Sequence, residues 1–135
     1  MFKIIIIFFV FLFSVCSYGT EEHKESLLKS SYSWEGTPYE HYPVGNPQLS
    51  LLKVSLNPKE VLNWHMHPCI SVVHMIKGSV TLTIKDKGIE KTFNEGDSFS
   101  DTVNIVHKGK AGSDGAVMLV FFACNKEKPL TISNY

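Results

Sequence analysis

Three histidines have the spacing to bind one metal ion. His65 and His67 are separated by a single residue, and His107 follows later in the chain. Side chains two positions apart on a β-strand point to the same face, roughly 6–7 Å apart at Cβ. Two imidazoles at that spacing can converge on one ion, at about 2.0–2.1 Å from each nitrogen. The pair alone is weak evidence, because two surface histidines on a strand edge give the same pattern.

The elements that would position these histidines are β-strands. From Leu49 onward apolar and polar residues alternate, clearly so in residues 52–56 and 80–84. Residues 72–76 form a short apolar run, and residues 116–123 are apolar on both faces, which is typical of a buried central strand. Between the strands we predict turns, at Lys77-Gly78, Asp86-Lys87-Gly88, Asn94-Glu95-Gly96-Asp97 and Ser113-Asp114-Gly115. Many short strands with Gly-rich turns predict an all-β sandwich or barrel, in which one hairpin separates the two histidine segments.

The first residues have the form of a secretory signal peptide. Lys3 precedes an unbroken apolar run, and Ser17-Tyr18-Gly19 offers the small residues that signal peptidase reads. We therefore predict a signal peptide over residues 1–19, export to the periplasm or the medium, and no stable membrane span after cleavage. The alternative is a lipoprotein acylated at Cys16. Residues 20–48 follow as a polar lead-in and an irregular arm that lies on the domain, and residues 49–135 form one barrel domain.

Composition excludes one class of partner. All 13 basic residues are lysines, the formal net charge is +0, and no basic stripe is visible, so a nucleic-acid partner is not expected. Without arginine there is no planar fork to hold a carboxylate or phosphate. A small anionic ligand would therefore be held by a metal ion, by lysine or by main-chain N–H groups. Cys69 and Cys124 can pair in an oxidising compartment, but two small buried side chains are the favoured interpretation.

The spacing of these residues resembles the cupin superfamily. Its first motif is His-x-His, a Glu and a Gly, which here fall on His65, His67, Ser71 and Gly78. Its second motif is a Gly and a later His, which here are Gly96 and His107. The resemblance covers residues 49–124 and implies a double-stranded β-helix, or jelly-roll barrel, that forms homodimers. It also implies a Zn, Fe, Ni or Mn ion, whereas imidazole ligands in general suit Zn, Fe, Cu or Ni.

The sequence departs from this pattern where the family has its glutamate. Ser71 has a short neutral side chain that is not expected to reach the ion, so we predict a three-histidine site that keeps the full 2+ charge. Cys69 and His74 are lower-ranked ligand candidates, because Pro68 breaks the strand near Cys69 and His74 is expected to point away from the ion. Asp101 is expected to be solvated, with approach to the site as the alternative.

Three functional hypotheses follow from this site. The first is a small metal-dependent enzyme acting on a small, anionic molecule, with a metal-bound water or oxygen as the reactive group. The second is a module that binds a small ligand or a metal without turnover, which the missing glutamate favours. The third is a structural barrel with vestigial histidines. One barrel hosts many functions, so fold alone does not choose among them.

Overall fold

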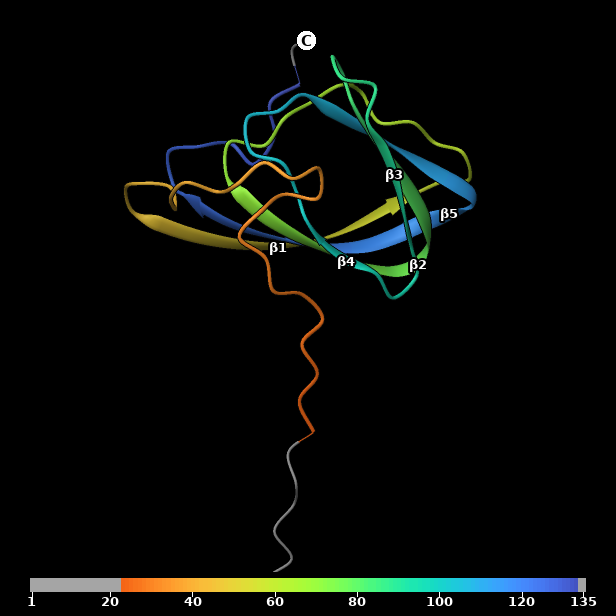
Figure 1. The fold of residues 1–135 in the computed structure, drawn as a ribbon, viewed down its shortest axis with the longest axis horizontal. Helices are drawn as coiled ribbons and strands as arrows, with labels where there is room; N and C mark the ends of the chain where they lie inside the picture. Colours follow the sequence, from red (N-terminus) through yellow and green to blue (C-terminus); the bar gives the residue numbers. More distant parts are fainter. Residues whose placement is uncertain (1–22, 134–135) are drawn as a thin grey trace, which may run out of the picture.

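Five strands form one curled antiparallel sheet in the computed structural model, which describes residues 23–133 (Figure 1). They are β1 (Pro47–Leu56), β2 (Ile70–Ile84), β3 (Glu90–Asn94), β4 (Ser98–Ser100) and β5 (His107–Asn125). The order across the sheet is β1-β5-β2-β3, and β4 also pairs with β2. The all-β prediction is confirmed. The predicted central strand lies within β5, between β1 and β2, but it is buried on one face only, and Phe121 on the other face is 38% exposed. The predicted signal peptide, with Cys16, lies outside the described residues. In the described range no helix is long and apolar enough to span a membrane.

Two of the predicted turns are wrong, because β2 and β5 run on through them as long strands. Both strands bend where Gly78 of β2 lies against Gly115 and Ala116 of β5, and the register shifts between Met75 and Val80. Gly78 and Gly115 have φ values of 72° and 78°. Two facing glycines with positive φ let both strands bend at the same place while their main-chain hydrogen bonds continue on either side of the bend. In the sequence of one strand, the same glycine gives the pattern of a hairpin turn.

We expect Gly78→Ala to destabilise the barrel strongly. A Cβ at position 78 would lie 2.1 Å from the Gly115 carbonyl oxygen, so strain and overpacking should lower the free energy of unfolding by roughly 2–4 kcal/mol. Gly88→Ala is the matched control, because Gly88 has a φ of 61° but an added Cβ there would meet nothing within 4 Å; it should cost about 1 kcal/mol. Urea denaturation measures both, and equal losses would contradict the close contact.

Alternate residues of the long strands point into the barrel. Val73 and Met75 of β2 are buried. The ring of Phe99 in β4 stacks on that of Phe93 in β3, with centroids 3.9 Å apart. Trp34 of the N-terminal arm packs against Phe93, and its main-chain N–H donates to the Ser100 carbonyl at 2.8 Å. The predicted arm therefore lies on the domain, although its last two residues already belong to β1.

Cys69 and Cys124 form a disulfide, so the favoured prediction of two free buried thiols is wrong. Ile70 pairs with Ala123 across β2 and β5, and this register brings the two cysteines to a Cα–Cα distance of 5.2 Å. Both side chains are buried, as expected. The pairing depends on strand register, which the two positions in the sequence do not specify.

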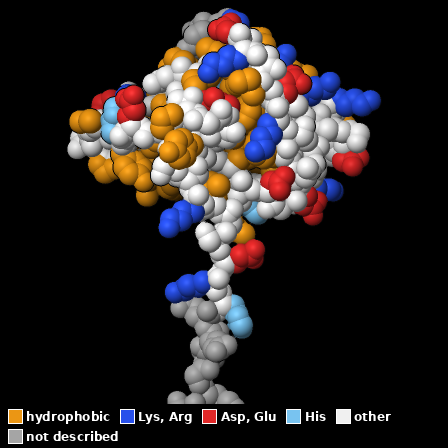
Figure 2. Space-filling model, in the orientation of Figure 1, with side chains coloured by type: hydrophobic (Ala, Val, Ile, Leu, Met, Phe, Trp, Pro, Cys, Tyr) orange, Lys and Arg blue, Asp and Glu red, His pale blue; other side chains and the backbone are white. Residues whose placement is uncertain are grey.

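Strand β1 forms one edge of the sheet and exposes apolar side chains. Leu49 and Leu51 are 67% and 65% exposed, and Leu52 is 41% exposed. Figure 2 shows hydrophobic side chains gathered at this end of the molecule. Exposed apolar patches often mark interaction surfaces. The homodimer stays a prediction.

Candidate metal centre

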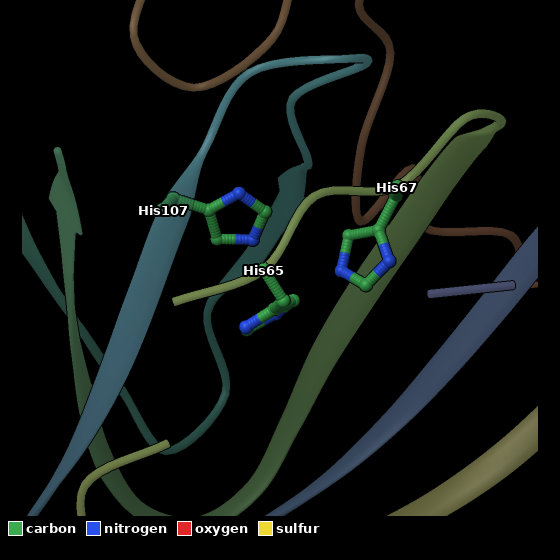
Figure 3. A group of neighbouring side chains, drawn as sticks. All are labelled: His65, His67 and His107. Carbon is green, nitrogen blue, oxygen red and sulfur yellow. The ribbon is translucent and has the colours of Figure 1, made fainter. Parts of the chain in front are cut away.

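The three predicted histidines are brought together by main-chain pairing. His107 begins β5, and its N–H and carbonyl exchange hydrogen bonds of 2.8 and 2.9 Å with His65. The next residue, Met66, pairs in the same way with Ile132. The segment is thus extended at Met66, which turns His65 and His67 to the same side. Figure 3 shows the three imidazole rings facing one another.

The spacing of the rings suits a single ion. The ring centroids of His65 and His107 lie 4.5 Å apart, those of His65 and His67 5.0 Å, and those of His67 and His107 5.2 Å. One nitrogen from each ring lies within 4.8 Å of the other two. Two ligands of a tetrahedral ion are about 3.4 Å apart. The cluster therefore has the composition and the approximate spacing of a site for one divalent ion.

Each imidazole is oriented by a main-chain carbonyl. The Nδ1 atoms of His65, His67 and His107 lie 2.7, 2.8 and 2.9 Å from the carbonyl oxygens of Asn63, Leu130 and Ile105, respectively. A carbonyl only accepts, so each Nδ1 carries the hydrogen and each Nε2 keeps a free lone pair. This is the arrangement that fixes histidine ligands in metal sites. Three imidazoles with the same tautomer, clustered together, are better explained by a metal site than by three histidines that only pack in the core.

Burial keeps two of the rings in the form that binds metal. It lowers the pKa of His65 and of His67 below the usual value, because a buried imidazolium loses its hydration. His67 is buried, and His65 is half-buried. Both imidazoles are therefore neutral at neutral pH, as a metal ligand must be.

Asp101 is also part of this cluster, so the expectation that it is solvated is wrong. Its side chain is buried, and Oδ2 lies 3.6 Å from Nε2 of both His67 and His107. Burial by itself would raise the pKa of Asp101, but the two histidines hold it below its usual value. Burial would lower the pKa of His107, and the carboxylate outweighs this and raises it. The sequence signal was its place in the second motif, six residues before His107.

The lower-ranked candidates lie elsewhere. Cys69 is bonded to Cys124 and offers no thiolate. His74 points away from the cluster, as expected, and its Nδ1 lies 2.8 Å from the Ser98 hydroxyl. Ser71 is buried and does not line the cavity beside the histidines; within residues 23–133 its hydroxyl has no hydrogen-bond partner. None of the three reaches the point on which the histidines converge.

The histidine cluster opens into a cavity of about 360 Å³. Its walls are mostly apolar and come from all of the long strands, as with Leu52, Val80, Met118 and Phe122. Besides the three histidines, its polar lining consists of Asn63, Asp101, Thr131 and Ser133. No lysine lines it in the described part of the chain, so an anion inside has only a metal or neutral donors to hold it. The volume suits a small molecule.

The fold and the cluster define a class, the cupin β-barrels, which confirms the predicted resemblance at the level of the fold. Among solved structures, the chain is similar to an RmlC-like cupin from Shewanella frigidimarina (20% identity over 58% of this chain and 68% of that one, TM-score 0.50). It is also similar to Bacillus subtilis oxalate decarboxylase, in a structure concerned with its Mn(II) centres (28% identity, 59% of this chain, TM-score 0.53). A third is the DMSP lyase DddQ from Ruegeria pomeroyi (16% identity, 75% of this chain, TM-score 0.57).

The similarity covers only part of two of these proteins. The chain spans 22% of the length of the oxalate decarboxylase and 48% of that of the DMSP lyase. No protein-family model and no curated protein sequence matches it. The oxalate decarboxylase has Mn(II) centres, and the histidine cluster of this chain fits a metal site.

Proposed function

We propose that the protein binds one divalent metal ion through His65, His67 and His107 and acts on a small molecule held in the barrel cavity. The observation that carries this proposal is the set of three Nδ1–H groups held by main-chain carbonyls, which leaves three Nε2 atoms free at one point. A histidine that serves only packing has no reason to share this orientation with two others. Zn, Fe, Ni, Mn and Cu are the candidate ions, since all accept imidazole nitrogen.

The surrounding residues indicate what the cavity would hold. A bound divalent ion would supply Lewis-acid chemistry, polarising an oxygen of a ligand or lowering the pKa of a water molecule. The apolar walls would exclude water and hold the carbon part of the molecule, while Asn63, Thr131 and Ser133 offer hydrogen bonds. The ligand class is therefore a small molecule with an anionic or oxygen-rich end and an apolar body. Oxalate, the substrate in the name of one similar enzyme, has no apolar body and so probes only the anionic end.

Removing a histidine should remove the metal. We expect purified protein to contain about one equivalent of metal per chain, and His65→Ala and His107→Ala to contain almost none, because two remaining imidazoles hold an ion far more weakly. His74→Ala is the matched control, since the His74 ring contacts Ser98 and lies outside the cluster. This variant should keep its metal. Elemental analysis of folded protein measures this. The proposal would be contradicted if the wild type, purified without chelator and then incubated with each candidate metal, still contained no metal.

A second candidate is binding without turnover. It is favoured by the lining of the cavity, in which, apart from the three histidines and Asp101, the described residues carry no titratable group to act as a general base. The two candidates differ in one result. A set of small carboxylates, incubated with protein loaded with each metal, is consumed by an enzyme and only retained by a binding module.

Export is the proposed setting of either activity. Its supports are the signal-peptide pattern in residues 1–19 and the Cys69–Cys124 disulfide, since disulfides persist mainly in oxidising compartments such as the periplasm and the medium. The alternative lipoprotein form would carry its lipid on Cys16. Mass spectrometry of the mature N-terminus separates the two.

A further inference from the structure

We propose that Asp101 is the fourth protein ligand of this metal site, a carboxylate supplied from the end of β4 in place of the glutamate that the cupin pattern puts at position 71. The inference rests on the proposed metal binding and adds to it the identity and charge of the ligand set. It revises the expectation of three neutral ligands: with Asp101 bound, a divalent ion would carry a net charge of about 1+.

The Asp101 carboxylate lies at about ligand-to-ligand distance from two of the histidines. Oδ2 of Asp101 lies 3.6 Å from Nε2 of His67 and 3.6 Å from Nε2 of His107. A carboxylate that served only to pair with an imidazolium would approach its nitrogen to about 2.7–2.9 Å, the donor–acceptor distance of a charge-assisted N⁺–H···O⁻ hydrogen bond. The observed separation is close to the spacing of about 3.4 Å between two ligands that share a tetrahedral ion. It is also the metal-binding Nε2 atoms, not the Nδ1 atoms, that the carboxylate faces.

The carboxylate is held in this orientation from its other side. Oδ1 accepts the main-chain N–H of Thr102 at 2.7 Å, which leaves Oδ2 free to face the histidines. The main-chain N–H of Asp101 donates to the Ser71 carbonyl at 2.9 Å, and its own carbonyl accepts the hydroxyl of Tyr39 in the N-terminal arm. The arm thus fixes the residue that faces the ion. Metal sites typically hold their ligands through such outer contacts.

Positions 101 and 71 lie side by side. The hydrogen bond between their main chains makes Asp101 the direct neighbour of Ser71 on the adjoining strand. A glutamate at position 71 and an aspartate at position 101 would thus compete for one space. Ser71 is small and stays out of the cavity, whereas Asp101 lines it. A carboxylate is present beside the histidines after all, but it comes from the residue that follows β4 instead of from β2.

Metal-binding measurements on Asp101→Asn test this directly. Asparagine keeps the shape and the acceptor for the Thr102 N–H but loses the charge. We expect the affinity for Zn(II) to fall about tenfold and that for Mn(II) about a hundredfold, because Mn(II) depends more on carboxylate oxygen. Asp114→Asn is the matched control, since Asp114 is exposed and lies outside the cavity. The Co(II) absorption spectrum should also change in Asp101→Asn, which a purely structural role for the side chain would not produce.

The possible outcomes separate this inference from the proposed function. Unchanged affinities and an unchanged Co(II) spectrum in folded Asp101→Asn, with His65→Ala and His107→Ala still metal-free, would overturn the role of Asp101 and leave the histidine site standing. Absence of metal binding in the wild type would overturn both. Should Asp101→Asn not fold, a crystal structure of the wild type loaded with Zn(II) decides: Oδ2 at about 2.0–2.2 Å from the ion supports the inference, and Oδ2 beyond coordination distance overturns it.

Discussion

Removing the Cys69–Cys124 disulfide is expected to lower the free energy of unfolding by about 4 kcal/mol. The bond closes a loop with a sequence separation of 55 residues, and the loss of chain entropy in the unfolded state for a loop of that length gives about this value. Both side chains are buried, so the double variant Cys69→Ala/Cys124→Ala also loses some apolar packing. Urea denaturation of the oxidised wild type and the double variant measures the difference.

The reductant provides the control for this prediction. Dithiothreitol should destabilise the wild type by a similar amount and leave the double variant unchanged, because only the wild type has a bond to reduce. The loss should extend to the metal centre, since Cys69 lies two residues after His67 and ties that segment to the end of β5. A wild type whose denaturation midpoint does not respond to dithiothreitol, with free thiols verified by alkylation, would contradict the prediction.

The fold class and the three clustered histidines could be predicted because local patterns encode them. Alternation with a period of two indicates strands, and the His-x-His pair needs only an extended segment to share a face. Whether two strands are separate or continuous is not local. The predicted turns at Gly78 and Gly115 failed because these glycines lie against each other across two strands, and neither position alone reveals its partner.

The same reason explains what was missed at the site. Asp101 reads as an ordinary loop acid, and its place beside His67 and His107 depends on the pairing of β4 with β2. The disulfide likewise depends on register. The departure at Ser71 was visible in the sequence, but the compensating carboxylate lies on another strand, so only the three-dimensional arrangement suggests the substitution of one acid for another.

Acidification should release the metal, with a loss of affinity of roughly a hundredfold or more between pH 8 and pH 5. Protons and the ion compete for the same three Nε2 atoms, and each imidazole below its pKa costs up to about tenfold per pH unit. Although burial would lower the pKa of His107, Asp101 raises it above the ordinary 6.5, so His107 takes a proton first as pH falls. Burial lowers the pKa of His65 and His67 below that value, and these protonate later.

The signs of these shifts predict the shape of the curve. A plot of the logarithm of the dissociation constant against pH should be flat well above the pKa of His107, then shallow while His107 alone titrates, and steeper once His65 and His67 take part. Competition with a chelator of known pH dependence measures it, and circular dichroism verifies that the barrel stays folded. A constant affinity from pH 8 to pH 5 would mean that the ion does not bind these nitrogens. Asp101→Asn should move the shallow region to lower pH, because the group that raises the pKa of His107 is then gone.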